Sequence, residues 1–477
     1  MRQVVGILGF LTLCVGATMV VPLVVGLLQN EEEAWDFLVA LVISVASGSV
    51  VSLWGLRGKM NIGRRGAFAI VSFGWVTASV FGAIPFCLSG IFSPLDALFE
   101  VISGFTTTGA SVLSRVTDLP KSILLWRSMV QWLGGMGIIL LGVAVLPLLG
   151  VGGVQLYRAE VPGPFLDKLR PKIADTARLL WQTYFLITSL QVALLAAGGM
   201  SAFDSVCHSF TTMATGGFST RTESIAHYGH YHRIVIILFM FLAATNFSLH
   251  YALAKGTIGQ YWADREFRFY VAVMILSTLA VFGFLVRQGQ GSWLKTLEDA
   301  CFQVVSIMTT TGYATADFDN WPTFCKYVLF ALMFVGGCAG STGGGIKCIR
   351  FLVIYKYLQG ELRRLLHPQA VVAVKIGKQA VPLGVVHQVI GMSLLYLGIF
   401  VIASGIMTAL GLDLVTSISS VAATLGNIGP GLAQVGPASH YGDVPALGKV
   451  VLIFCMLAGR LEIYTVFVLL FPEYWKK

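Results

Sequence analysis

The sequence predicts an all-α integral membrane protein, with four similar repeats around a central pore and two extra N-terminal transmembrane helices. Three observations support this fold class. The chain of 477 residues is 56% hydrophobic and only 12% charged, whereas a soluble protein carries about 25% charged residues. It contains long apolar runs of the length that a bilayer requires. Four shorter segments between those runs resemble one another.

The apolar runs predict the membrane spans. A bilayer core of about 30 Å needs about 20 apolar residues of helix. The first run is too long for the core of a cleavable signal peptide, and we interpret it as a spanning helix. The eighth run is interrupted by glycines. We expect ten spans, at roughly residues 4–28, 35–55, 68–90, 125–149, 179–199, 233–254, 268–286, 326–358, 385–411 and 446–471.

The basic residues indicate the orientation of these spans. Most of the 32 Lys and Arg residues lie in loops on one side, including 57–65, 158–178 and 347–378. The positive-inside rule places this side and both termini in the cytoplasm, and the acidic stretch 31–33 outside. The net charge of +9 follows from these loops, so we do not expect nucleic-acid binding. We expect membrane lipid as the surroundings of the chain.

The eight cysteines do not suggest a metal site. They form no CxxC pair, and no histidines lie at zinc-binding spacing. We interpret them as small buried helix residues. We therefore expect no cofactor in the chain itself.

Four outer segments of about 15 residues are too short to cross the bilayer. Each begins with Asp and has Gly thirteen residues later, with Thr two residues before that Gly; in the second segment Gly217, not Gly216, keeps this register. The segments read DALFEVISGFTTTGA (96–110), DSVCHSFTTMATGGF (204–218), DACFQVVSIMTTTGY (299–313) and DLVTSISSVAATLGN (413–427). We predict that each forms a helix reaching about halfway into the membrane, then turns and returns outward.

Capping residues support these half-crossing helices. Ser93, Ser201 and Thr296 each lie three residues before the Asp, in the S/T-x-x-D pattern of a helix N-terminus. Pro94 suits the first helical position, and Leu410 makes the fourth cap weaker. Polar residues four positions after each Asp are expected to tie the helices to neighbouring loops. They are Glu100, His208, Gln303 and Ser417.

Such half-helices suit cation binding. Each ends near mid-membrane with unpaired carbonyls and the negative end of its dipole, and four turns around an axis can replace the water shell of an ion. Accidental similarity of ordinary surface loops is one alternative. An inverted-repeat transporter is another, but here every repeat starts in the cytoplasm, which favours a pore. We expect a helix pair at 1–60 and repeats at 61–155, 156–258, 259–365 and 366–477.

The motifs TTTGA, ATGGF, TTTGY and TLGNIGPG resemble the filter loops of the Trk/Ktr/HKT superfamily of potassium transporters, most closely its TrkH-type pore subunits. The resemblance covers residues 68–477, and the extra N-terminal pair is typical of TrkH-type members. It implies potassium transport through M1–P–M2 units, in a homodimer of the bacterial inner membrane. It also implies a cytoplasmic nucleotide-binding ring of RCK (TrkA) type, which the basic inner loops can dock unless they merely obey the positive-inside rule.

The resemblance also implies which residues form the filter. Backbone carbonyls of the four loops would coordinate potassium as the transported substrate, and one further residue flanks the last loop. The implied residues are Thr107, Thr108, Gly109; Thr215, Gly216, Gly217; Thr310, Thr311, Gly312; and Thr424, Leu425, Gly426 with Asn427.

The glycine cluster in the eighth span predicts a broken helix, because each Gly costs about 1 kcal/mol relative to Ala. The resemblance implies an intramembrane loop that blocks the pore. Its residues are Gly336, Gly337, Gly340, Ser341, Thr342, Gly343, Gly344, Gly345 and Lys347. GSTGGGIK lacks the Gly-Lys-Ser/Thr of a phosphate loop, and AGSTG lacks the first Gly of a hydrolase elbow. We therefore do not predict an enzyme.

Arg460 completes the expected gate. A charge within a span costs about 3 kcal/mol unless it meets a partner or water. One interpretation is an ion pair with Glu462 or another carboxylate. We favour contact with the glycine-rich loop, where the charge would raise the barrier to cations. An alternative function is a sodium- or proton-coupled secondary cation transporter, which flux without a coupled ion would exclude.

Overall fold

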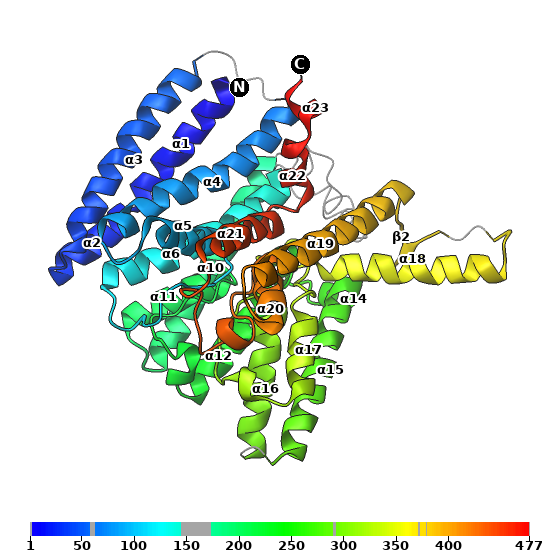
Figure 1. The fold of residues 1–477 in the computed structure, drawn as a ribbon. Coiled ribbons are helices and arrows are strands. Elements are labelled where there is room, and N and C mark those ends of the chain that lie inside the picture. The colour runs from blue at the N-terminus through cyan, green and yellow to red at the C-terminus, as the bar shows by residue number, and fades with distance from the viewer. Residues whose placement is uncertain are drawn as a thin grey trace.

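The computed structural model describes residues 2–57, 63–144, 173–289, 292–370, 373–377 and 379–476. This part of the chain is mostly helical (Figure 1). Its strands are limited to a short antiparallel hairpin of β1 (Lys375–Ile376) and β2 (Gln379–Ala380). Six helices are long and apolar enough to cross a membrane, or up to eight if two bent helix pairs each form one span. The all-α membrane fold is therefore confirmed.

The N-terminal helices form a pair beside the first repeat (Figure 1). The first span consists of α1 (Arg2–Thr18) and α2 (Val20–Gln29), and the second is α3 (Glu33–Gly55). Small residues let α1 and α3 pack closely, since a Cβ atom on Gly48 would lie 2.6 Å from the backbone nitrogen of Leu13. The Glu31 carboxylate joins this pair to the repeat, because it accepts hydrogen bonds from the N–H groups of Lys121 (2.7 Å) and Ser122 (3.0 Å).

The rest of the chain repeats one order of elements four times. The long first helices are α4 (Arg64–Leu88), α10 (Ile173–Ala197), α15 (Arg265–Arg287) and α19 (Leu383–Ala409). The short second helices are α5 (Pro94–Phe105), α11 (Ala202–Met213), α16 (Trp293–Met308) and α20 (Leu414–Leu425). The third helices are α6 (Lys121–Ala144), α12 (His230–Ala243), α17 (Thr323–Leu332) and α21 (Ala446–Arg460). Three of the short second helices have 12 residues and α16 has 16, so they are about 18–24 Å long and too short to cross the bilayer.

The predicted spans 4–28, 35–55, 68–90, 179–199, 268–286 and 385–411 coincide with the six long helices. The predicted span 125–149 is helical to Ala144, and its remainder lies outside the described residues. The repeat boundaries predicted near residues 60 and 155 also lie outside them. The full division into repeats stays a prediction.

Three of the third helices do not continue straight, so the predicted spans 233–254 and 446–471 are not single straight helices. Helix α12 bends by 103° into α13 (Phe247–Ala254), and α21 bends by 112° into the segment of α22 (Tyr464–Phe467) and η4 (Val468–Leu470). In the third repeat, non-helical residues 333–347 separate α17 from α18 (Cys348–Leu366). Helix α18 projects from the bundle (Figure 1). The predicted break in the eighth span is confirmed.

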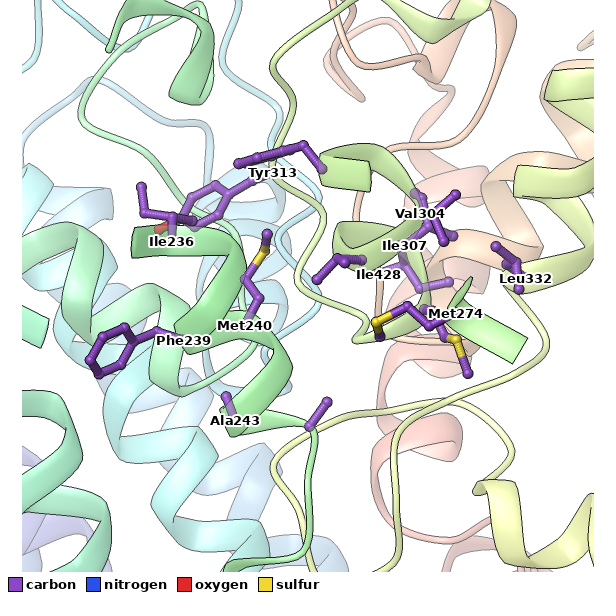
Figure 2. Packing of buried hydrophobic residues seen from close by; sticks show 14 of the residues in the cluster. Ile236, Phe239, Met240, Ala243, Met274, Val304, Ile307, Tyr313, Leu332 and Ile428 are labelled. Carbon is purple, nitrogen blue, oxygen red and sulfur yellow. The ribbon is translucent and has the colours of Figure 1, made fainter. Parts of the chain in front are cut away.

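The remaining short elements lie in loops and at the C-terminal end. They are η1 (Ser224–His227), α14 (Gly259–Ala263), η2 (Phe318–Asn320), η3 (Ala433–Val435) and α23 (Pro472–Trp475). The largest apolar cluster lies among the second, third and fourth repeats (Figure 2). It brings together Met240 of α12, Met274 of α15, Ile307 of α16 and Ile428, which follows α20. The cluster thus packs residues of α16 and α20 against helices of the second and third repeats.

Candidate functional site: a carbonyl ring and a glycine-rich loop

The N-termini of α5 and α11 are capped as the sequence predicts. The hydroxyl of Ser93 accepts a hydrogen bond from the N–H of Asp96 (3.2 Å), and that of Ser201 accepts one from the N–H of Asp204 (3.0 Å). Pro94 occupies the first helical turn. These caps satisfy backbone donors that the helix itself leaves unpaired.

The N-termini of α16 and α20 differ from the prediction. Helix α16 begins one turn earlier than expected, with Ser292 as N-cap, and Thr296 instead donates its hydroxyl to the Ser292 carbonyl (3.0 Å). In α20, Asp413 is itself the N-cap and accepts from the N–H of Thr416 (3.0 Å). Hydrogen bonds from Thr416 lower the pKa of the Asp413 carboxyl below its usual value.

All four short helices end in the same strained turn. The N–H after each turning residue bonds to the carbonyl five residues back, at 2.8–2.9 Å, as in a Schellman motif. Glycine is usual at the left-handed position of this motif, so a β-branched residue there is strained. The turning residues are Thr107 (φ 53°), Thr215 (φ 55°), Thr310 (φ 60°) and Asn427 (φ 55°). The glycines two residues later are also left-handed: Gly109 (φ 80°), Gly217 (φ 76°), Gly312 (φ 78°) and Gly429 (φ 101°).

The fourth loop corrects the predicted register by three residues. Thr424 and Leu425 lie in the last turn of α20, and Gly426 is its C-cap in a right-handed conformation. The residues equivalent to Thr107-Thr108-Gly109 are Asn427-Ile428-Gly429. The error arose because Asp413 caps its helix, whereas Asp96 lies three residues after its cap, so aligning the aspartates shifted the repeat.

The four turns, which we call the turn loops (106–110, 214–218, 309–313 and 426–430), close into a ring. A Cβ atom on each glycine would collide with the carbonyl oxygen that precedes the glycine of the next loop. Gly109 meets Gly216 O, Gly217 meets Thr311 O, Gly312 meets Ile428 O, and Gly429 meets Thr108 O at 2.7 Å. The contacts run from the first loop through the fourth and back to the first, so all four turns surround one axis.

We call the carbonyls of Thr108, Gly216, Thr311 and Ile428 the carbonyl ring. Gly216 O accepts a hydrogen bond from the Gln131 amide (2.6 Å). Within the described part of the chain, the other three carbonyls accept no hydrogen bond. Backbone oxygens without protein donors are the groups that can replace the water shell of a cation.

A cavity of about 120 Å³ lies against the ring. It is lined by Gly109, Gly217, Gly312 and Gly429 and by the loop residues that follow them. The cavity therefore gives access to the ring from the side toward which the chain returns after each turn.

Polar side chains tie three of the short helices to the chain after the turns, as predicted. The Glu100 carboxylate accepts from the Ser111 hydroxyl (2.9 Å), His208 Nε2 bonds to the Ser219 hydroxyl (3.0 Å), and Gln303 donates to Thr315 (3.4 Å). Ser417 does not serve the fourth repeat in this way, because its hydroxyl donates to Leu412 O. In the fourth repeat, Ser419 ties α20 to the chain after the turn, because its hydroxyl accepts a hydrogen bond from the N–H of Leu432 (3.0 Å).

Glu100 also forms a buried ion pair, which the sequence analysis missed. Its carboxylate lies 2.7 Å from Nη2 of Arg127 on α6, and both side chains are buried. The same guanidinium lies over the ring of Phe218 in the second turn loop, 4.1 Å from the ring centroid. The pair thus joins the first repeat to the second next to the carbonyl ring.

The glycine-rich loop (residues 333–347) packs against the turn loops. The N–H of Gly344 donates to the Thr310 hydroxyl (2.6 Å), and a Cβ atom on Gly344 would lie 2.9 Å from Cβ of Asn427. The hydroxyl of Thr342 lies 3.0 Å from the carbonyls of both Met213 and Ala243, in the second repeat. The loop therefore contacts elements of the second, third and fourth repeats.

Arg460 binds this loop. Its Nη1 donates to Thr342 O (2.7 Å), and the side chain is buried. The alternative interpretation, an ion pair between Arg460 and Glu462, is wrong, because Glu462 forms its ion pair with Arg350. The contact that we favoured from the sequence is present, and its effect on ion flux stays a prediction.

Glu266 is a further residue that the sequence analysis missed. Its Oε1 atom accepts hydrogen bonds from the N–H groups of Ala339 (2.8 Å) and Ile349 (3.0 Å). One carboxylate in the first turn of α15 thus holds both the glycine-rich loop and the start of α18. Nothing in its local sequence distinguishes it from an ordinary acidic residue near a helix N-terminus.

The described residues contain no group of three or more His, Cys, Asp or Glu side chains that could hold a metal ion. The polar atoms that meet the glycines around the ring are backbone carbonyl oxygens. The helical spans and the ring define a membrane transport protein.

The family follows from comparison with known proteins. The model of the TrkH family, described as "Cation transport protein", matches residues 36–477, so the chain belongs to this family of transporters, which are not enzymes. The chain is 42% identical over its full length to the "Trk system potassium uptake protein TrkH" of Halomonas elongata, and 41% identical to that of Escherichia coli K12, covering 100% and 99% of those proteins. The crystal structure of "the Potassium Transporter TrkH from Vibrio parahaemolyticus" superposes with a TM-score of 0.92 at 38% identity, covering 100% of this chain and 99% of that one.

Proposed function

We propose that the chain is the pore subunit of a potassium uptake system and that its turn loops form the selectivity filter. The closed cycle of contacts among the four turn loops carries this proposal. The identity of the ion comes from the relatives, which are named potassium uptake proteins. In the fourth repeat the filter residues are Asn427-Ile428-Gly429, in place of Thr424-Leu425-Gly426.

The physical basis is the exchange of water for protein oxygens. Four short helices direct their C-terminal ends, which carry about half a negative charge each, toward one axis. The carbonyl ring supplies oxygens at the same place, and the strained turns keep these oxygens from relaxing into helical hydrogen bonds. A potassium ion that enters from the outer cavity would lose water and gain carbonyl oxygens.

The glycine-rich loop would form the gate. Its bonds to Thr310 and Arg460 keep it packed against the turn loops, so an ion can pass only when the loop moves. Glycines allow the backbone to adopt a second conformation at low cost.

The surroundings of the pore follow the same proposal. We propose that the chain lies in the bacterial cytoplasmic membrane as a homodimer with both termini inside. The relatives are named as members of a Trk system, which supports a regulatory partner. A cytoplasmic nucleotide-binding ring of RCK type would meet the basic inner segments around α18.

Uptake of rubidium and sodium into proteoliposomes tests the filter. Gly312→Ser should lower the rubidium-to-sodium uptake ratio, because its Cβ would collide with Ile428 O at a residue with φ of 78°. Gly411→Ser is the matched control, since Gly411 is also left-handed (φ 93°) but has open space around it. A ratio equal to wild type in folded Gly312→Ser protein would refute the filter assignment.

A sodium- or proton-coupled transporter is the alternative function. The pore proposal predicts rubidium flux that follows its electrochemical gradient without added sodium and without a pH gradient. Flux that stops when both are removed would favour the coupled transporter.

A further inference from the structure

The second turn loop differs from the other three at the residue that contributes to the carbonyl ring. This residue is Gly216, followed by Gly217, whereas the other loops have Thr108, Thr311 and Ile428. The two threonine hydroxyls each pair with the hydroxyl two residues before them, both at 2.8 Å. The second loop has no side chain at this position and contains two consecutive glycines, so its backbone is the least restrained of the four.

The side chain of Gln131 occupies the space that is vacant in this loop. Gln131 lies on α6 of the first repeat and is fully buried. A Cβ atom on Gly216 would overlap the Gln131 amide group. The Gln131 Nε2 group donates to Gly216 O (2.6 Å), and its Oε1 atom accepts from the N–H of Phe218 (3.1 Å). The Gln131 amide therefore binds the residues before and after Gly217, and both its nitrogen and its oxygen are hydrogen-bonded.

We propose that Gln131 is a positioning residue for the ion filter, and this rests on the proposed function of the turn loops. It restrains the double-glycine loop from outside, in place of the side chain that the first and third loops carry themselves. Its hydrogen bond also fixes the direction of the Gly216 carbonyl, one of the four oxygens of the carbonyl ring. Selectivity in such a ring depends on the number and strength of its carbonyl dipoles, so Gln131 sets ion selectivity without touching the ion.

Gln131→Leu tests this role in proteoliposomes. The rubidium-to-sodium uptake ratio should fall about five- to tenfold, the effect of losing one or two neutral hydrogen bonds at a buried site. Gln191→Leu is the matched control. Gln191 is equally buried, on α10, and has no hydrogen-bond partner among the described residues. A ratio equal to wild type in monodisperse Gln131→Leu protein would overturn the proposal.

A compensating pair of substitutions keeps the test valid if Gln131→Leu does not fold. Gly216→Thr alone should lower the ratio, because the new side chain meets Gln131. Combining it with Gln131→Ala should restore most of the ratio, because the loop then carries its own side chain. No recovery in the double variant would refute the proposal. The outcome is separable from the filter assignment: an effect of Gly312→Ser without any effect at Gln131 rejects only the role of Gln131.

Discussion

Replacing Glu266 with alanine should release the glycine-rich loop and raise ion flux. The Glu266 carboxylate holds the N–H of Ala339 at 2.8 Å and that of Ile349 at 3.0 Å. It therefore fixes the loop and the first turn of α18 to one point on α15. Because the carboxylate is only 2% exposed, little water is present to replace it. A movement of α18 that opens the pore would have to break at least one of these bonds.

The size of the effect follows from these contacts. A hydrogen bond to a charged group contributes about 1.5–3 kcal/mol. If opening breaks one of the two bonds, removing the carboxylate destabilises the closed conformation by about 2 kcal/mol, which shifts the open-to-closed ratio about 30-fold. The filter is untouched, so the rubidium-to-sodium ratio should stay at its wild-type value while total rubidium flux rises.

The assay is rubidium uptake into proteoliposomes at matched protein density, with two controls. Glu266→Gln keeps a side-chain oxygen that can accept both N–H groups, so its flux should rise only a few-fold. Glu361→Ala removes an exposed carboxylate of α18 that pairs with Arg364, and it should leave flux unchanged. The reasoning is refuted if folded Glu266→Ala protein conducts like wild type, or if Glu266→Gln raises flux as much as Glu266→Ala.

Three further substitutions test other contacts. Arg460→Ala removes the bond to Thr342 O (2.7 Å) and a charge from the proposed gate, so rubidium flux should rise about tenfold. Unchanged flux, or a loss of flux with normal folding, would count against a gate role. Glu100→Ala leaves the Arg127 guanidinium buried without its carboxylate partner, so it should destabilise the fold by about 3–5 kcal/mol. The thermal midpoint in detergent should fall, and an unchanged midpoint would contradict this prediction. Glu31→Ala removes the cap on α6 and should cost about 1 kcal/mol without changing the rubidium-to-sodium ratio, and a changed ratio would show that the N-terminal pair acts on the filter.

Local chemistry is what the sequence predicts well. Ser93 and Ser201 cap their helices as expected because capping depends on residues three apart, which the sequence displays directly. The glycines at 109, 217 and 312 are left-handed as the turn requires. The helix break at 333–347 follows from helix propensity alone.

Local sequence chemistry could not determine the register of the fourth loop. The segment TLGNIGPG offers both Gly426 and Gly429, and the preceding Asp413 can serve as a cap or as a residue of the first turn. Both choices satisfy local chemistry. Only the backbone shows that Asn427 and Gly429 are left-handed, while Gly426 ends the helix in a right-handed conformation.

Contacts between residues of different repeats could not be predicted from the sequence either. Gln131 and Gly216 are 85 residues apart in the sequence, and Glu266 and Ala339 are 73 apart. No periodicity or motif connects residues at such distances, because the contact depends on how helices of different repeats pack. Only the structure shows these contacts, because it places the polar atoms of Gln131 and Glu266 next to particular backbone groups.

The contacts differ between the turn loops, which we propose as the filter, and the glycine-rich loop, which we propose as the gate. Each turn loop keeps its strained residue through a hydrogen bond within its own helix end, and the loops also support one another, as when Asn427 donates to the Thr108 hydroxyl (3.0 Å). Strain of about 1–3 kcal/mol per residue persists only where the surroundings fix it in this way. The glycine-rich loop is fastened to other elements by the side chains of Thr310, Arg460 and Glu266, and by backbone bonds such as the one from the N–H of Cys338 to Ala244 O (2.9 Å). The bonds from Arg460 and Glu266 do not involve the turn loops. Substitutions at these two residues should therefore change how often ions pass, and substitutions around the ring should change which ions pass.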